Sequence, residues 1–155
     1  KAYNLHFIDK YSGIKKWHQS LQTEAIKNKC ITLPTGRQFA FPHAKRTKTG
    51  GATGATKIKN YPVQALATAD IVPLCLVALR EELQKNKLRT TIVNTVHDSV
   101  LLDCPNEEVD RVKQLVEDVL SPSSTKDRIY LYYNINMDVP LPIDTKTGSN
   151  WLNMS

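Results

Sequence analysis

A single carboxylate, Asp98, stands at the sharpest turn that the sequence predicts. Runs of β-branched and apolar residues flank it over 90–96 and 100–104, which predicts a β-hairpin with this carboxylate at its tip. A rigid tip could hold the carboxylate where a metal ion reaches it, because Mg²⁺ takes oxygen ligands and keeps several waters. The alternative is an ordinary turn residue, since Asp tolerates left-handed backbone and bonds nearby amides. The spacing alone leaves both interpretations open.

The nearby sequence offers no second acid to share a metal ion with this carboxylate. Asp103 lies further along the predicted strand, about 16 Å away at about 3.3 Å per residue. A Ser-His-Asp triad from residues 97–99 is also excluded, because consecutive turn residues diverge whereas triad members converge from separate parts of a fold. Asp70 lies in an apolar helical segment, where a capping or ion-paired residue is expected rather than a catalytic one.

Two amide side chains, Asn60 and Gln64, are four residues apart at the predicted start of a helix and therefore share one face. Such a pair could hydrogen-bond base edges in a DNA minor groove, which offers mostly acceptors. Alternatively, Asn60 only satisfies the first backbone groups of the helix. The two interpretations remain equally open at this point.

Basic residues are concentrated in the first half of the chain. Residues 1–69 carry a net charge of +10 and residues 70–155 a net charge of −4, within a total of +6. No acid occurs between Ala25 and Ala69, a stretch that includes the Gly-rich run 49–56, whose backbone can approach a phosphate closely. A polyanionic partner is favoured over a solvated basic face, because clustered cations gain affinity by releasing counterions. The cations are Lys27, Lys29, Arg37, Lys45, Arg46, Lys48, Lys57 and Lys59.

Length and composition exclude several classes of protein. The 155 residues suit one domain, and 41% apolar with 23% charged residues excludes collagen-like and largely disordered chains. The longest apolar run, 71–79, is too short to span ~30 Å of hydrocarbon, so we expect no membrane partner. Three widely spaced cysteines without a C-x-x-C pair favour a reducing compartment over a disulfide framework or a zinc site. The chain begins at Lys1, which suggests a piece of a longer sequence or a processed product.

The periodicity of apolar residues predicts the elements that must position these groups. We expect helices over about 5–11, 13–28, 62–86 and 109–119, hairpins from 30–33 with 38–41 and 90–96 with 100–104, and loops over 42–59 and 121–125. We further expect a strand over 128–137, an extended edge segment over 139–143, and a tail held in place by Trp151. In the apolar helix, Pro62 suits the first turn, Pro73 bends the axis, and 71–79 is buried all round. No repeat or domain boundary is visible, and the order of elements predicts an α+β fold with an antiparallel sheet.

Five runs of residues, in this order, resemble motifs of the C-terminal part of the polymerase domain of family A DNA polymerases, of the phage-encoded kind. They cover essentially the whole chain. They are Tyr11-Ser-Gly-Ile14, Leu33-Pro-Thr-Gly-Arg37 with Phe39 and Phe41, Lys59-Asn-Tyr-Pro-Val-Gln64 followed by Ala67-Thr-Ala-Asp-Ile71, Thr95-Val-His-Asp-Ser99, and Gly148-Ser-Asn-Trp151.

The resemblance implies a role for each matching residue. Asp98 would be one of two catalytic carboxylates that bind Mg²⁺, and His97 would contact the primer end. Asn60 and Gln64 would touch the minor groove near the primer terminus, and Arg37 would face the nucleic-acid backbone. Residues 1–155 would then form the C-terminal part of a palm with an antiparallel sheet and packed helices. The partners would be primer-template DNA and a dNTP, and the location would be cytoplasmic (the host cytoplasm if phage-encoded).

Two expected parts of such a polymerase domain are absent from the sequence. There is no Asp-Tyr-Ser-like strand for the first carboxylate and no fingers helix to grip the incoming nucleotide, and Ser99 stands where many relatives have an acid. We therefore expect no polymerisation by the chain alone, with the remaining polymerase segment supplied in cis or as a separate chain. The alternative is a non-catalytic nucleic-acid-binding accessory module. A free-standing metal nuclease would need a second acid beside Asp98.

Overall fold

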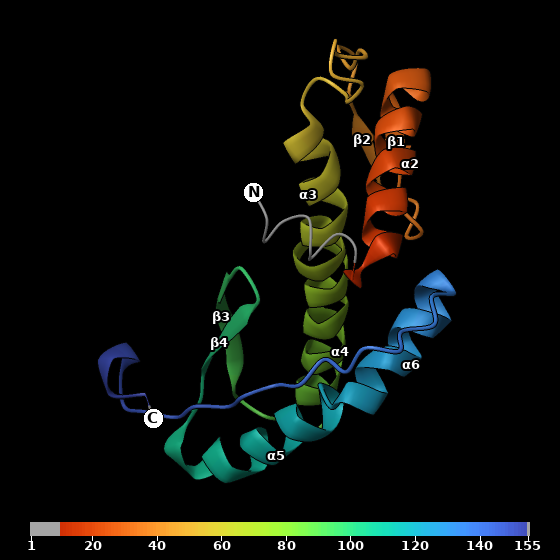
Figure 1. Ribbon diagram of the computed structural model, residues 1–155. Coiled ribbons are helices and arrows are strands. Elements are labelled where there is room, and N and C mark those ends of the chain that lie inside the picture. The colour runs from red at the N-terminus through yellow and green to blue at the C-terminus, as the bar shows by residue number, and fades with distance from the viewer. Residues whose placement is uncertain (1–9, 155) are drawn as a thin grey trace. The chain divides into compact units, whose positions relative to one another are not determined.

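The computed structural model describes residues 10–154, which form two compact units, residues 10–66 and residues 67–154 (Figure 1). The junction between the units falls inside the helical residues 55–85. A junction inside a helix needs no flexible linker, which explains why the sequence shows no boundary there. The helical piece expected over 5–11 falls, apart from its last two residues, outside the described residues.

The N-terminal unit begins with helix α2 (Ser12–Asn28), which confirms the predicted helix. Its buried residues, Leu21 and Ala25, are one helical turn apart and face the rest of the unit. The helix ends where Lys29 adopts a left-handed conformation with a φ of 57°. The Lys29 ammonium then donates to the carbonyl of Ala44 at 2.6 Å, which ties the helix end to the segment after the first hairpin.

The first predicted hairpin is confirmed as strands β1 (Cys30–Thr32) and β2 (Gln38–Ala40), which pair antiparallel with Cys30 opposite Ala40. Its turn is closed by a hydrogen bond from the Gly36 N–H to the Leu33 carbonyl at 2.9 Å. Gly36 has a φ of 86°, a conformation that costs a glycine nothing. The hairpin therefore follows from a local turn signal.

Helix α3 (Ala55–Ala65) begins seven residues earlier than predicted. The expectation of a loop through residue 59 and of Pro62 in the first turn is wrong, because the helix begins directly after Gly54, which has a φ of 73°, and Pro62 lies inside it. Ile58, Pro62 and Ala65 are buried at helical spacing, so packing stabilises the turn that Pro62 weakens. The remaining loop contains an isolated antiparallel bridge between Arg46 and Ala52.

The C-terminal unit contains most of the π-helical turn η1 (Leu66–Ile71) and then helix α4 (Val72–Lys85). Pro73 lacks an N–H, and the π-helical turn ends two residues before it, at Ile71. The predicted bend of the helix axis at Pro73 stays a prediction. The expectation that 71–79 is buried all round is wrong, because Val77 is 54% exposed while Ala78 and Leu79 are buried. One face of α4 packs within the unit and the other does not.

The second hairpin consists of β3 (Thr91–Val96) and β4 (Ser99–Asp103), as predicted. A 3-10 turn η2 (Asn106–Glu108) leads into α5 (Val109–Val119), which confirms the amphipathic helix. The hairpin and both helices share one apolar core. The buried centre is Leu79, Leu83 and Val112, and the partly buried residues around it are Leu88, Ile92, Val100, Leu102, Cys104, Leu115 and Val116.

Helix α6 (Pro122–Tyr133) replaces the loop expected over 121–125 and the strand expected over 128–137. The Ser121 hydroxyl caps the helix by accepting from the Ser124 N–H at 3.3 Å, and Pro122 occupies the first turn. Thr125 and Ile129, one turn apart, are the buried residues. This capping and burial prevail over the β-preference of the aromatic run that ends the helix.

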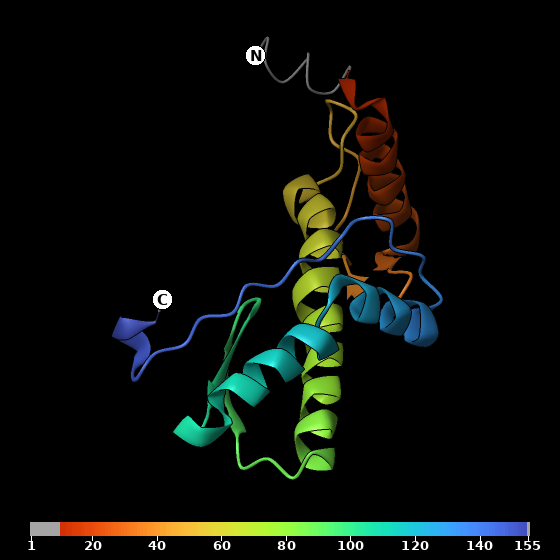
Figure 2. The same cartoon turned by 90° about the horizontal axis from the view of Figure 1, so that it is seen from below.

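Residues 134–150 run from α6 to the 3-10 turn η3 (Trp151–Asn153) without joining a sheet (Figure 2). The expected edge segment over 139–143 therefore has no strand beside it. The expected pinning by Trp151 is also wrong, because this side chain is 61% exposed. In the described part of the chain the sheets are two antiparallel hairpins, which confirms the α+β class with small antiparallel sheets.

By length and composition alone, the helical residues 55–85 could cross a membrane, with a mean hydropathy of 1.7 in the best 18-residue window. Apolar core helices pass the same test, and 33% of that window is buried. The test is therefore weak evidence for a membrane span, and the expected absence of a membrane partner stays a prediction.

Candidate functional site

The turn of the second hairpin places His97 and Asp98 at an exposed tip. Val96 pairs with Ser99, so these two residues alone form the loop, and His97 has a φ of 56°. Histidine is one of the residues enriched in this left-handed region, which a tight turn requires. The Ser99 hydroxyl donates to the Val96 carbonyl at 2.9 Å and fastens the turn. The carboxylate of Asp98 is thus held by a tight turn and faces solvent.

A β-bulge lies between the tip and the root of this hairpin. The pairing shifts between Ile92 and Asn94, which leaves Val93 as the extra residue on β3. Bulges bend a strand and increase its twist, and they are frequent near active sites, where they redirect side chains. Asp103 lies opposite Thr91 at the root, at the end of β4 away from the turn that carries Asp98.

The hairpin root is fastened to the start of α5 by a carboxylate. Glu108 accepts hydrogen bonds from the N–H groups of Arg89 and Thr90 at 3.0 Å, and from the Thr90 hydroxyl at 2.8 Å. The Arg89 guanidinium also pairs with Glu107. The N–H of Arg89, followed by the hydroxyl and N–H of Thr90, lowers the pKa of Glu108. Figure 1 shows the turn of the hairpin at the end away from α5.

We expect acid to loosen this root. A carboxyl group whose pKa is lower in the folded chain stabilises the fold above its ordinary value of 4.5, and that stabilisation is lost as the pH falls through the lowered value. Urea titrations should show the unaltered chain more stable than Glu108→Gln at pH 7, with the difference shrinking below pH about 4. Glu81→Gln, on the exposed side of α4, is the matched control, and an equal effect there would contradict this role.

The amide pair and one lysine lie on one face of α3, in the N-terminal unit. At about 100° per residue, Lys57, Asn60, Tyr61 and Gln64 lie within an arc of about 100°. All four are exposed. The buried face, formed by Ile58, Pro62 and Ala65, is separate from this arc. The structure therefore brings the predicted residues Lys57, Asn60 and Gln64 to one accessible surface.

Lys59 points away from that surface. It lies outside the arc and acts electrostatically on His18 of α2, whose pKa is lowered first by burial and then by the Lys59 charge. The other predicted basic residues lie on loops. Arg37 directly precedes β2, and its carbonyl accepts from the Leu33 N–H at 2.8 Å. Lys45, Arg46 and Lys48 are exposed in the segment that carries the isolated bridge.

Replacing Lys59 with Ala should raise the pKa of His18 toward its ordinary value of 6.5. The pKa should stay below that value because burial, the larger cause, remains. An NMR titration of the imidazole protons measures this shift. Lys57→Ala removes the same charge from a different face of the helix and should leave His18 unchanged. A larger shift from Lys57→Ala than from Lys59→Ala would contradict the placement of Lys59.

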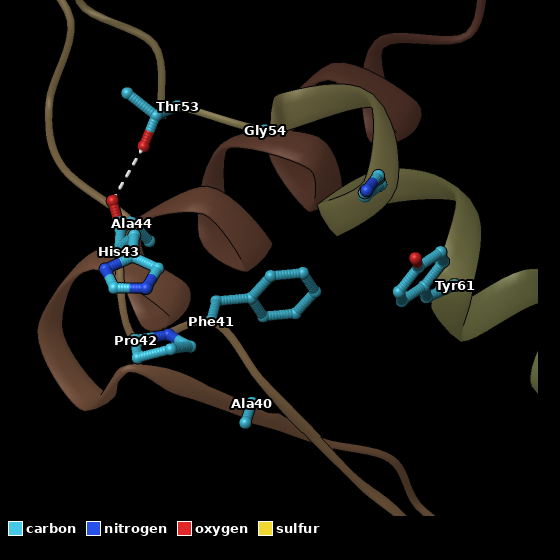
Figure 3. Close-up of a pocket in the computed structure, with 9 residues that line it drawn as sticks. Ala40, Phe41, Pro42, His43, Ala44, Thr53, Gly54 and Tyr61 are labelled. Carbon is cyan, nitrogen blue, oxygen red and sulfur yellow. Dashed lines mark hydrogen bonds between the residues drawn. The ribbon is translucent and has the colours of Figure 1, made fainter.

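A pocket of about 430 Å³ opens beside α3 in this same unit. Figure 3 shows the rings of Phe41 and Tyr61 facing one another across it. Their centroids are 6.1 Å apart, and Phe39 contacts the Tyr61 ring at 5.5 Å. Tyr61 was not among the residues predicted to be functional, although its spacing of four residues from Lys57 places both side chains on one face. The lining residues are Ala40, Phe41, Pro42, His43, Ala44, Thr53, Gly54, Lys57 and Tyr61.

Among residues 10–154, no three His, Cys, Asp or Glu side chains come together as a metal site. Asp98 fits a magnesium ion as one exposed oxygen ligand, and Mg²⁺ is commonly held by one or two carboxylates with the rest of its shell from water or substrate.

Asp70 is 5% exposed in η1, and its carbonyl accepts from the Tyr133 hydroxyl at 3.4 Å. This burial agrees with the expected structural role of Asp70.

The family model described as DNA polymerase family A matches residues 1–153. Since the match covers nearly the whole sequence, the chain belongs to DNA polymerase family A. This confirms the family expected from the five runs of residues, while the phage-type part of that expectation stays a prediction.

Individual relatives agree with the family. DNA polymerase I of Lactococcus lactis subsp. lactis (strain IL1403) is 28% identical over 153 residues, and DNA polymerase I of Pseudomonas aeruginosa is 27% identical over 153 residues. Both matches cover 97% of this chain but only 16% and 15% of those relatives. The chain thus spans a small part of their length.

A solved structure shows the same fold. The POL domain of Pol1 from M. smegmatis, in a complex with DNA primer-template and dNTP, matches with a TM-score of 0.68 at 21% identity. The match covers 88% of this chain and 22% of that one. The architecture is therefore that of part of a polymerase domain.

Proposed function

We propose that the chain is the C-terminal part of the palm of a template-directed DNA polymerase, which transfers nucleotides from dNTPs to a primer 3′-hydroxyl. The observation that carries the proposal is the exposed Asp98 on a tight hairpin tip, in a chain whose family match covers residues 1–153. The cytoplasm, or the host cytoplasm for a phage-encoded chain, is the proposed location.

In this proposal Asp98 supplies one of the carboxylates of a divalent-metal site, with Mg²⁺ as the ion. Enzymes of family A use divalent metal ions, which when bound activate the primer hydroxyl and stabilise the leaving pyrophosphate. The chain's own part is to hold the carboxylate still on the hairpin and to place His97 beside the primer end. Rigid placement matters because most of the catalysis lies in positioning and electrostatics.

The basic N-terminal unit is proposed to hold the primer-template duplex. The amides of Asn60 and Gln64, exposed on one face of α3, suit hydrogen bonds to acceptors in the minor groove. The phosphate backbone would be held by cations, which add affinity without sequence preference. These cations are Arg37, Lys45, Arg46, Lys48 and Lys57, together with Lys59, which would contact phosphates beyond the face of the two amides.

The first palm carboxylate and the fingers, absent from residues 1–155, are proposed to come from a remaining polymerase segment, in cis or as a separate chain. The test is primer extension with Mg²⁺ by the chain alone and after mixing with a polypeptide that carries those motifs. We expect incorporation only in the mixture. Incorporation by residues 1–155 alone would contradict the proposal.

A non-catalytic accessory module is the competing function. It is favoured by the isolation of Asp98, since the described residues bring no group of three metal ligands together. Such a module would bind duplex DNA in a salt-dependent way that neither Mg²⁺ nor Asp98→Asn alters. In this case Asp98→Asn would also leave primer extension by the mixture unchanged. Primer extension therefore separates the two functions.

A further inference from the structure

We propose that the pocket beside α3 binds one nucleotide of single-stranded DNA, with its base against the Tyr61 ring and its phosphate near Lys57. The proposal rests on the proposed function for its choice of DNA. It adds a site for an unpaired base next to the duplex contacts, with which it shares Lys57 and the loop cations.

The walls of the pocket suit a nucleobase. Its volume of about 430 Å³ lies within the range of small-molecule pockets, roughly 300–1,000 Å³. Tyr61 is 37% exposed although its ring contacts Phe39 and Phe41, so part of the ring remains accessible beside them. Aromatic rings stack on any base, because every base presents a π-face.

The rim of the pocket is held by hydrogen bonds. The Ala44 N–H donates to the Phe41 carbonyl at 2.9 Å, which closes a β-turn over residues 41–44. Pro42 is the second residue of this turn, a position where proline is favoured. The Thr53 hydroxyl donates to the His43 carbonyl at 3.0 Å (Figure 3) and accepts from the Lys45 N–H at 3.0 Å. A preformed rim lowers the ordering cost of binding.

The charge around the pocket favours a strand over a free nucleotide. Lys57 is exposed, and among the described residues no carboxylate pairs with it, so its ammonium is available to a phosphate. Lys45 adjoins the rim through its backbone contact with Thr53, and Arg46 and Lys48 follow in the same acid-free stretch. These cations exceed what one phosphate group needs and suit several successive phosphates of a strand.

The pocket continues the surface proposed for the duplex. Lys57 and Tyr61 share the exposed face of α3 with Asn60 and Gln64, within an arc of about 100°. A strand that leaves a duplex held by the two amides therefore meets the pocket on the same side of the helix. This continuity identifies the occupant as a nucleotide of the unpaired strand.

The test measures binding of a fluorescein-labelled dT oligomer to the full chain by anisotropy. Tyr61→Phe keeps the ring and should bind within about twofold of the unaltered chain, whereas Tyr61→Leu should bind about 5- to 150-fold more weakly, the loss of one base–aromatic stack. Tyr130→Leu, at an exposed tyrosine of α6, is the matched control and should change nothing. Equal affinities of the Tyr61→Phe and Tyr61→Leu variants would overturn the proposal.

A second measurement tests the phosphate contact. The slope of log affinity against log salt concentration should fall by about 0.7 in Lys57→Ala, because one phosphate contact to a single strand is lost. Lys113→Ala, on α5, should leave the slope unchanged. An unchanged slope in Lys57→Ala would overturn the assignment of this lysine.

Crosslinking of the unaltered chain keeps the proposal testable if Tyr61→Leu does not fold. Irradiation with an oligomer containing 5-iodouracil should attach the base to Tyr61 or Phe41, and attachment only outside residues 40–61 would overturn the site. Binding of free dTTP as tight as that of the oligomer would overturn the choice of a strand. Oligomer binding by Tyr61→Leu and primer extension by Asp98→Asn are separate readouts, so this site and the proposed catalytic function can fail independently.

Discussion

Asp98→Asn should lower nucleotide incorporation by roughly 10³-fold in a polymerase assembled from this chain and the remaining segment, since loss of about 4 kcal/mol of transition-state stabilisation has that effect. Asn is nearly the same size as Asp, and the side chain is exposed, so the hairpin should be retained. The change removes the negative charge that a divalent ion needs. Primer extension with Mg²⁺ at saturating dNTP measures the loss.

The matched control for this prediction lies on the same hairpin, at its root. Asp103→Asn removes an exposed carboxylate at the root of β4, opposite Thr91, and should leave incorporation within about twofold because it lies about 16 Å from the tip at about 3.3 Å per residue. Primer-template affinity should be similar in both variants. Full activity of Asp98→Asn, or equal losses in the two variants, would contradict a metal-binding role for Asp98.

Leu79→Ala should destabilise the chain by about 2–5 kcal/mol, the usual cost of truncating a buried leucine. Leu79 is 1% exposed and forms the buried core with Leu83 and Val112. Ile92 and Val100 of the second hairpin pack against the same core, so the cavity lies beneath the strands that carry the tip. Urea unfolding monitored by circular dichroism gives the free energy of unfolding.

Val77→Ala is the control for this substitution, because Val77 lies on the same helix but is 54% exposed. We expect a change within about 0.5 kcal/mol there. Destabilisation of Val77→Ala as large as that of Leu79→Ala would mean that the wrong face of α4 has been assigned to the core.

The second hairpin was predictable because its signals are local. β-branched runs on both sides of a short turn specify the pairing, and the structure places Asp98 at the tip as expected. The bulge at Val93 was not predicted, since no Gly or other residue type marks it. The amide pair was also predictable, because helical spacing alone puts Asn60 and Gln64 on one face whatever the helix start.

The errors arose where packing and capping compete with residue preference. Helix α3 extends through Pro62 because burial of the face formed by Ile58, Pro62 and Ala65 outweighs the missing N–H. Helix α6 forms from a run rich in tyrosine because Ser121 caps it and Ile129 is completely buried. The ring cluster around Tyr61 is a tertiary contact between α3 and the first hairpin, so no local sequence pattern predicts it.

The most direct measurement is a crystal structure of the assembled polymerase with primer-template, dNTP and Mn²⁺, in which anomalous scattering locates the ions. The proposed function predicts a metal ion bonded to an Asp98 carboxylate oxygen at about 2.1 Å, with the primer 3′-hydroxyl beside it. An ion shell built entirely from other residues, or a hairpin tip turned away from the duplex, would contradict it.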